Sequence, residues 1–490
     1  MYRILRTMTF ANLSSRVPAR IWAYLSLIVW GVITLLLASR TPFGLEEGGA
    51  KALLLAWSVA DQVASSVVTF SAPDLRTLLF MPVGMLWPGN VFAAKVLLAI
   101  GIAHTAWLLF DWQRRRSGDE AALLSVGVWL IAPSTLAQID QLGPAPFLIW
   151  CFALGRRLDD AYRVAPRPFG GNFFAQLALC ALAVSLHPAG LAYPAALAWG
   201  WWKQPLDRAQ QRSFLAGIGL VTLVTLVARV SWNDVTLLAD PLPALAGVLV
   251  RSDGGLDAAG WVAVVAVVAV TIVVALLQRR ALLGDLLGNS LLLGVLLGAV
   301  AADATWGVLL LLLLLLFGFP MLLQPPDPGK TPGFLGQRGI ALAVLCVLCL
   351  TYMFADKQRY LEHRDGQMSA QDALIRTLAD EVAGERAAVA GDRDEAKKLH
   401  VRVASQWPSR TMVACKCDTL PLPPAAADPD AQLAMLRTVT LVVLDPKAPA
   451  NRTLSGNLAA LGGRVETVGL QPGGVILRLR DNEAAAGTSK

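Results

Sequence analysis

The chain contains a long series of apolar segments separated by short polar loops, and this alternation is the feature that most constrains its fold. A helix of about 20 apolar residues crosses the hydrocarbon core of a bilayer, and somewhat shorter segments cross where the membrane adapts or helices pair as hairpins. With 55% hydrophobic and only 16% charged residues, the 490-residue chain lies outside the range of soluble globular proteins. The apolar segments are Ile21–Ser39, Val91–Phe110, Ala121–Gln138, Ala145–Leu154, Phe173–Leu186, Ala189–Trp202, Phe214–Val230, Gly260–Leu277, Leu286–Ala302, Thr305–Leu323 and Ile340–Phe354. We therefore predict a polytopic α-helical membrane protein with about eleven transmembrane helices.

Basic residues are distributed unevenly between the loops, and this asymmetry predicts the topology. Alternate loops carry groups of Arg and Lys, whereas the loops at 139–144, around His187 and at Asp303 carry none. Because cytoplasmic loops are enriched in Lys and Arg, the N-terminus is predicted to be cytoplasmic and the C-terminal region to lie outside. The basic residues fall into small groups and form no continuous stripe, so the net charge of +7 does not indicate nucleic-acid binding.

Two adjacent carboxylates, Glu46 and Glu47, follow the first apolar segment, in the sequence Thr41-Pro-Phe-Gly-Leu-Glu-Glu-Gly-Gly-Ala-Lys51. Ionisable residues at the membrane boundary indicate a functional site, which would face a cavity at the outer surface. A simpler interpretation is that the pair ends a helix and is solvated. The half-apolar chain at 48–88, which contains Pro73, Pro82 and Pro88, is more typical of interfacial helices than of another span.

Further polar residues are predicted at the same outer face. They include Asp140, His187, Arg251, Asp253 and Asp303. Each has a purely structural interpretation, since Asp303 can end a helix and His187, which precedes Pro188, can cap a hairpin turn.

The composition changes after Ala355, where 356–490 is predicted to form a small α/β domain following a transmembrane domain at 1–355. A helical pattern at Ser369–Ala390 and a short helix at Asn457–Leu461 accompany β-rich runs at Thr411–Cys415, Val439–Leu444, Arg464–Val468 and Gly474–Leu479. Cys415 and Cys417 are judged too close in sequence for an ordinary disulfide. A metal site there would lack further Cys or His ligands.

The sequence resembles the polytopic membrane glycosyltransferases of the C-type fold, the superfamily of protein O-mannosyltransferases and lipid A aminoarabinose transferases. In that family an acidic pair, usually Asp-Glu, follows the first helix, and Glu46 and Glu47 are the matching positions. The stretch Gly89-Asn-Val-Phe-Ala-Ala-Lys95 and the later Glu120-Ala-Ala-Leu-Leu, followed by Ala132-Pro133, are also similar to family patterns. The resemblance covers about residues 20 to 205. Beyond them, the chain is similar to the family only in having many helices followed by an outer soluble domain.

The resemblance implies a mechanism in which a sugar on a polyprenyl-phosphate carrier is transferred with inversion to a lipid, glycan or protein acceptor at the periplasmic face. Glu46 or Glu47 would be the general base. Lys51, Arg76 and Arg251 would bind the donor phosphate. Asp140 would orient the acceptor or help to hold a divalent metal, and whether a metal is needed is left open.

The resemblance also implies a location in the bacterial inner membrane, with the C-terminal domain in the periplasm. The alternative is a non-catalytic membrane protein of the same fold that binds a lipid-linked glycan or scaffolds an envelope assembly. A transporter is a weaker interpretation, because the ionisable residues lie at the ends of the spans and no inverted repeat is visible.

Overall fold

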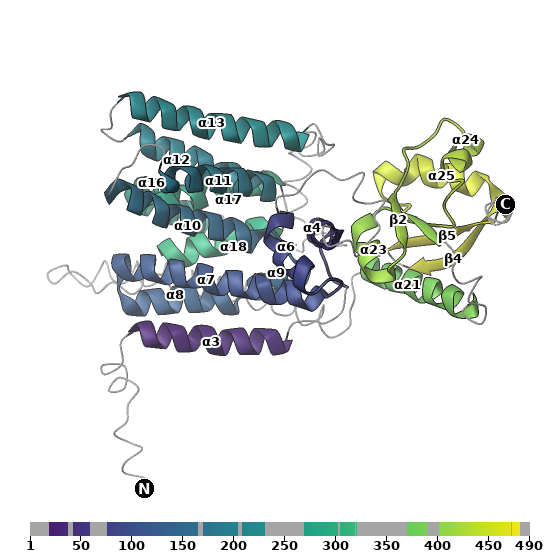
Figure 1. The fold of residues 1–490 in the computed structure, drawn as a ribbon, viewed down its shortest axis with the longest axis horizontal. Coiled ribbons are helices and arrows are strands. Elements are labelled where there is room, and N and C mark those ends of the chain that lie inside the picture. Colours follow the sequence, from purple (N-terminus) through teal and green to yellow (C-terminus); the bar gives the residue numbers. More distant parts are fainter. Residues whose placement is uncertain are drawn as a thin grey trace, which may run out of the picture. The chain divides into compact units, whose positions relative to one another are not determined.

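A computed structural model describes residues 19–37, 43–58, 76–164, 170–203, 208–230, 269–301, 304–318, 320, 370–389, 401–471 and 473–480 (Figure 1). These residues form two compact units. The helical unit contains the described residues of 19–37, 95–139 and 143–320. The mixed unit contains the described residues of 43–94, 140–142 and 370–480, so contacts group the segment after the first helix with the C-terminal region. The predicted boundary between 355 and 356 stays a prediction.

The helical unit follows the predicted apolar segments closely. Its helices are α3 (Ala19–Leu37), α7 (Val91–Ser117), α8 (Asp119–Ile131), α9 (Pro133–Gln141), α10 (Ala145–Val164), α11 (Gly171–Leu186), α12 (Ala192–Trp202), α13 (Arg208–Val230), α16 (Arg279–Gly284), α17 (Leu286–Ala301) and α18 (Ala304–Leu313). A 3₁₀ turn, η1 (Pro188–Leu191), precedes α12, and the Leu run continues from α18 into a π-helical turn, η3 (Leu314–Gly318). Residues at the start of Gly260–Leu277 and all of Ile340–Phe354 lie outside the described residues.

Two of the described helices, α7 and the central part of α13 (Gln210–Ala228), are long and apolar enough to cross a membrane. The predicted span Ala121–Gln138 consists of two helices, α8 and α9, bent by 48° at Ala132-Pro133. Proline lacks the N–H that would continue the helix, and it disfavours a helical conformation in the preceding residue, so Ala132 is extended. Together α8 and α9 could form a third span, and the predicted total of about eleven stays a prediction.

One acidic side chain joins three helices of the helical unit. Asp285 caps α17 through Oδ1, which accepts from the backbone N–H of Leu287 at 2.9 Å. Its Oδ2 accepts from Nε of Arg156 on α10 at 2.7 Å and from Nε1 of Trp112 on α7 at 3.2 Å. The carboxylate is thus bound by a helix N-terminus, a guanidinium and an indole, which offset the cost of its partial burial.

The mixed unit begins with two short helices, α4 (Glu47–Ser58) and α6 (Arg76–Leu86), which pack closely against each other. A Cβ at Gly84 would lie 2.6 Å from the backbone carbon of Ala56, so only glycine permits this approach. The stretch 48–88, for which helices were predicted, thus contains α4, which begins at Glu47, and α6. Residues 59–75 lie outside the described residues.

The C-terminal part of the mixed unit is a five-stranded sheet in the order β2-β1-β3-β5-β4. The strands are β1 (Arg402–Ser405), β2 (Asp418–Pro421), β3 (Leu441–Leu444), β4 (Val465–Gln471) and β5 (Gly474–Leu479). β1 is parallel to both β2 and β3, whereas β5 is antiparallel to β3 and β4. The helices are α21 (Ala370–Val389), α23 (Pro408–Cys415), α24 (Pro429–Met435) and α25 (Arg452–Ala460).

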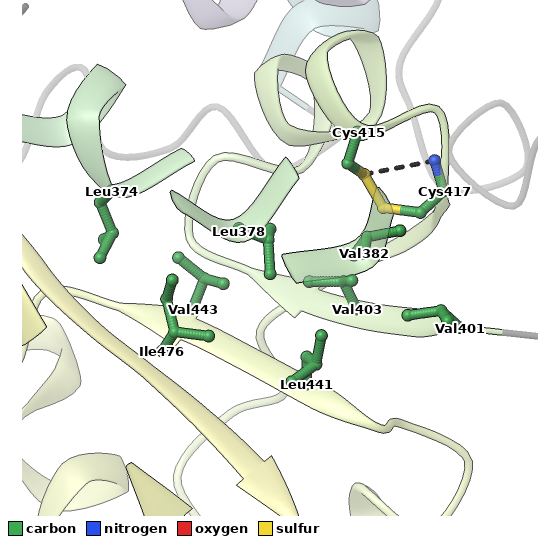
Figure 2. Packing of buried hydrophobic residues seen from close by; sticks show 10 residues of the cluster. All are labelled: Leu374, Leu378, Val382, Val401, Val403, Cys415, Cys417, Leu441, Val443 and Ile476. Atoms are coloured by element: carbon green, nitrogen blue, oxygen red, sulfur yellow. Dashed lines mark hydrogen bonds between the residues drawn. A yellow bond between two sulfur atoms is a disulfide. The ribbon is translucent and has the colours of Figure 1, made fainter. Parts of the chain in front are cut away.

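The central strand β3 is buried on both faces, which explains its uninterrupted apolar sequence. Leu441 and Val443 pack with Leu374 and Leu378 of α21 on one face (Figure 2). The alternate residues of β3 pack on the other face with Leu454 and other residues of α25. The helix predicted at Ser369–Ala390 and the strands predicted near Val439–Leu444, Arg464–Val468 and Gly474–Leu479 are confirmed.

The β-rich run predicted at Thr411–Cys415 is wrong, because these residues belong to helix α23. Pro408 occupies the first turn, where its missing N–H has no helical partner, and Ser409 and Arg410 follow it into the helix. The β-branched residues Thr411 and Val413 suggested a strand, but both are buried within α23.

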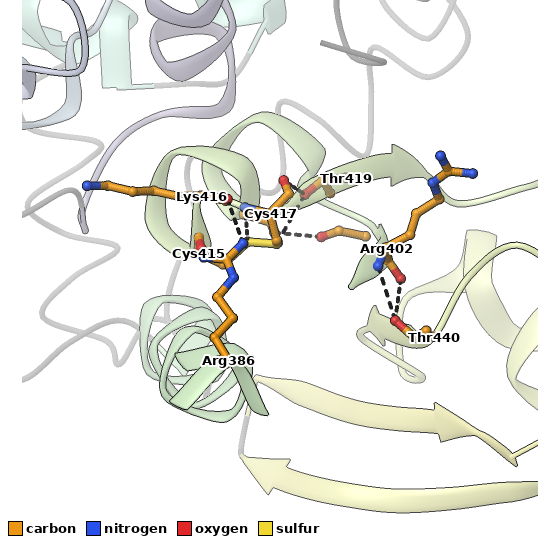
Figure 3. The surroundings of a disulfide bond; sticks show 9 residues. Arg386, Arg402, Cys415, Lys416, Cys417, Thr419 and Thr440 are labelled. Atoms are coloured by element: carbon orange, nitrogen blue, oxygen red, sulfur yellow. Dashed lines mark hydrogen bonds between the residues drawn. A yellow bond between two sulfur atoms is a disulfide. The ribbon is translucent and has the colours of Figure 1, made fainter. Parts of the chain in front are cut away.

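The structure also corrects the prediction for Cys415 and Cys417, which form a disulfide. Lys416 ends α23 in the left-handed conformation (φ 51°) and turns the chain back, so that the two Cα atoms lie 5.2 Å apart. This separation lies within the usual range for a disulfide. Nη2 of Arg386 on α21 donates to the carbonyl of Lys416 at 2.9 Å, which holds the same turn (Figure 3).

Peptide mapping of the purified chain without reduction tests this disulfide. The peptide containing Cys415 and Cys417 should resist alkylation under denaturing conditions and be lighter than the dithiol by two hydrogen atoms. Replacing both cysteines by Ser should lower the free energy of unfolding by only about 1–2 kcal/mol, because the loop closed by the bond is very short. Alkylation of both sulfurs without a reductant would contradict the assignment.

Candidate functional site

The acidic pair lies where the chain enters α4. The backbone carbonyl of Glu46 accepts from the N–H of Ala50 at 2.9 Å, so Glu46 is the residue before the helix and Glu47 is its first residue. The N–H of Glu46 donates to the carbonyl of Gln141 at 2.8 Å, and the Glu46 side chain is exposed. The backbone of Glu46 is thus fixed from both sides, and its side chain is accessible to solvent.

Two glycines after the pair allow close contacts. A Cβ at Gly49 would lie 2.7 Å from the carbonyl oxygen of Leu142, closer than real Cβ atoms approach. A Cβ at Gly48 would overlap the guanidinium of Arg76, whose Cζ would be 3.0 Å away. Arg76 is the first residue of α6 and is buried. The Gly-Gly sequence therefore lets the start of α4 lie directly against both Arg76 and residues 141–142.

The segment beside the acidic pair has an unusual backbone. After α9 ends at Gln141, Leu142 adopts a left-handed conformation with φ 54°. For a branched side chain such a conformation costs on the order of 1–3 kcal/mol. The Leu142 side chain is fully buried, and the carbonyls of Gln141 and Leu142 face α4. The strained turn thus places Asp140, which is half-buried, one residue from the carbonyl that binds Glu46.

The carboxylate of Glu47 binds the N-terminus of helix α23. Its Oε1 accepts from the backbone N–H of Ser409 at 2.8 Å, and its Oε2 accepts from that of Arg410 at 3.1 Å. Both N–H groups belong to the first turn of α23, where no helical carbonyl is available to them. A negative charge there is also stabilised by the helix dipole.

An ion pair that was not anticipated lies beside this contact. Nη2 of Arg410 donates to Oδ1 of Asp372 on α21 at 2.7 Å, and both side chains are largely buried. The same Oδ1 accepts from the N–H of Gly44, which has φ 81°, at 3.1 Å. Trp407-Pro408-Ser409 could have indicated a helix start, but nothing local pairs Gly44 with a residue 328 positions later.

The structure brings several of the predicted site residues together in the mixed unit. Glu46, Glu47, Arg76 and the segment containing Asp140 are close to one another, as described above. Lys51 lies four residues after Glu47 and so on the same face of α4. Arg251, with Asp253 and Asp303, lies outside the described residues.

His187 belongs to the helical unit. Its Nδ1 accepts from the backbone N–H of Ala189 at 3.1 Å, which caps the turn η1, and the side chain is 5% exposed. This geometry agrees with the capped turn considered from the sequence. In the part of the chain that the structure describes, no group of three or more His, Cys, Asp or Glu side chains could hold a metal ion.

Comparison with known proteins identifies the fold. No family profile and no curated protein sequence matches the chain. Two crystal structures of ArnT from Cupriavidus metallidurans, one in the apo state and one bound to undecaprenyl phosphate, are similar to it with a TM-score of 0.53. In each case the identity is 12%, and the match covers 96% of this chain and 100% of the other. ArnT is a lipid A aminoarabinose transferase, and the chain shares the fold of these structures, in agreement with the fold that the sequence resemblance predicted.

The close approach at Gly49 is testable by substitution. Gly49→Ala should destabilise the protein by about 1–3 kcal/mol, because the methyl group would displace the backbone of residues 141–142. Thermal unfolding of the purified chain in detergent measures this change.

Gly384→Ala is a matched control in the same unit, since a Cβ there meets nothing within 4 Å. Inside helix α21 the alanine should be neutral or stabilise by about 0.5–1 kcal/mol. Equal unfolding temperatures for the Gly49→Ala variant and the native chain would show that the turn at Leu142 is not packed as described.

Proposed function

We propose that the chain is a membrane glycosyltransferase that moves a sugar from a polyprenyl-phosphate donor to an acceptor at the periplasmic face of the bacterial inner membrane. The observation that carries this proposal is the fold. It matches ArnT over nearly the whole of both chains, and one of the ArnT structures contains undecaprenyl phosphate. The clustering of Glu46, Arg76 and the Asp140 segment in the mixed unit supports a site at the acidic loop.

Glu46 acts as the general base in this proposal. Its carboxylate takes the proton from an acceptor hydroxyl or amine as that group attacks the anomeric carbon. The bond from this carbon to the phosphate oxygen breaks on the opposite side, so the configuration inverts and polyprenyl phosphate leaves. The exposed side chain and doubly bound backbone of Glu46 support this role, because a base must be both accessible and fixed in position.

Binding of the leaving phosphate is assigned to cations near the acidic pair. Arg76, whose guanidinium lies against Gly48, and Lys51 on α4 are the candidates among the described residues, and Arg251 is a third from the sequence. A guanidinium can bind two phosphate oxygens at once. Asp140 is assigned to orienting the acceptor or to a metal.

The orientation proposed is an N-terminus in the cytoplasm and a C-terminal domain in the periplasm. The loop asymmetry in Lys and Arg supports it. The disulfide between Cys415 and Cys417 also supports it, because disulfides persist in the oxidising periplasm and are rare in the cytosol.

The proposal is tested by transfer of radiolabelled sugar from a panel of polyprenyl-phosphate donors to envelope material. Membranes with the native chain should incorporate label. Membranes with Glu46→Gln should lose at least about 100-fold in rate, because the amide cannot accept the proton. Arg76→Lys should weaken donor binding while the protein stays folded, because the ammonium group cannot bind two oxygens in the same plane.

A non-catalytic protein of the same fold is the second candidate, and the contact between Glu47 and α23 favours it, since this carboxylate has a structural partner. Such a protein would bind lipid-linked glycan or scaffold an envelope assembly. Absence of donor-dependent transfer by well-folded native chain, together with unchanged binding of polyprenyl phosphate in Glu46→Gln, would establish this candidate instead.

A further inference from the structure

We infer that the C-terminal α/β domain positions the acidic loop, Gly44 to Glu47. Helix α23 holds the Glu47 side chain, and Glu47 in turn positions the carboxylate of Glu46. This inference rests on the proposed function for its consequence in catalysis. Its structural part, the attachment of the loop to the domain, stands on contacts within the mixed unit and can be measured without an activity assay.

The loop from Gly44 to Glu47 is attached at four points. The N–H of Gly44 binds Asp372 at 3.1 Å, and the N–H of Glu46 binds the carbonyl of Gln141 at 2.8 Å. The carbonyl of Glu46 accepts the first helical bond of α4, from Ala50. The carboxylate of Glu47 binds α23 through two hydrogen bonds. Two of these four attachments, those of Gly44 and of the Glu47 carboxylate, come from the C-terminal domain.

Arg410 connects these two attachments. Its backbone N–H binds Glu47, while its guanidinium binds Asp372 and also Oε1 of Gln371 at 3.1 Å. Asp372 is only 3% exposed, and its buried carboxylate is paired with Arg410. One residue of α23 therefore fixes both ends of the loop that carries Glu46.

The geometry also separates the tasks of the two carboxylates. Both oxygens of Glu47 accept from backbone N–H groups, which hold the carboxylate turned toward α23. A base must be accessible to the acceptor, and the Glu46 side chain is exposed on a backbone that Glu47 helps to fix. A small displacement of a catalytic group can cost a large factor in rate, so loosening this attachment should slow transfer.

Hydrogen exchange measured by mass spectrometry on the full-length chain tests the attachment. Glu47→Gln replaces one acceptor oxygen by an N–H₂ group, which cannot accept from the amides of α23. We expect peptides covering residues 408–415 to gain deuterium at short labelling times at Ser409 and Arg410, and peptides covering 43–50 to exchange faster as the loop loosens. Unchanged exchange in both regions would overturn the inference. Glu47→Asp, which keeps the charge on a shorter side chain, should give an intermediate result.

Asp428→Asn is the matched control. Asp428 caps α24 in the same domain, where its Oδ1 accepts from the N–H of Ala431 at 2.7 Å, and this carboxylate also lies at a helix N-terminus. Its substitution should affect exchange at α24 only and leave both the loop and the transfer rate unchanged. An equal effect of Asp428→Asn on the loop would show that the Glu47 result reflects general destabilisation and would overturn the inference.

The dependence of transfer on pH tests the separation of tasks. If Glu47 only positions, Glu47→Gln should lower kcat about 10-fold, with little change in the KM for donor, and should retain the loss of rate at acid pH that reports Glu46. Glu46→Gln should remove that acid limb from any residual activity. Removal of the acid limb by Glu47→Gln would make Glu47 the base and overturn the inference. If no donor supports transfer, the proposed function fails while the exchange experiment still decides the attachment.

Discussion

The carboxylate of Glu47 at the N-terminus of α23 is the interaction on which the arrangement of the candidate site depends. A helix N-terminus offers N–H groups without helical partners and a partial positive charge, and an anion there is stabilised by about 0.3–1 kcal/mol at an exposed site and by up to about 2 kcal/mol where it is partly buried. In many parallel α/β units this end of a helix binds a phosphate. Here β1, α23 and the parallel strand β2 form such a unit, and a carboxylate from the distant acidic loop occupies the position.

The contacts beside Glu47 depend on the close packing of α4. Because Gly49 has no side chain, the start of α4 can lie against residues 141–142 and still reach α23. The carbonyls that it meets are turned toward it by the left-handed backbone of Leu142, a conformation that a leucine adopts only where the surrounding structure imposes it. The burial of the Leu142 side chain offsets this strain, so packing and backbone geometry at the site support each other.

Much of the fold could be predicted from sequence patterns that are local. Apolar runs predicted most of the described helices, and β-rich runs predicted β3 and β5 at the centre of the sheet. Local patterns failed where the same residue type is compatible with two structures. Thr411 and Val413 favour strands but lie in α23, and Cys415 and Cys417 meet only because Lys416 reverses the chain. Of the predicted site residues, the acidic pair, Arg76 and the segment containing Asp140 lie close together in the structure, and their roles stay predictions. Asp372 and Arg410 could not be anticipated, because their contacts with the loop join positions more than 300 residues apart.

The two adjacent glutamates also show why a motif does not by itself assign roles. Successive residues of a helix are rotated by about 100°, so two neighbouring side chains at a helix start cannot both face one target. Glu46, before the first turn, and Glu47, within it, must therefore have different surroundings wherever the helix is fixed by packing. In this chain one carboxylate has two backbone donors and the other is exposed. The two neighbouring glutamates therefore differ in their surroundings, and the proposed roles of base for Glu46 and positioning residue for Glu47 follow from that difference.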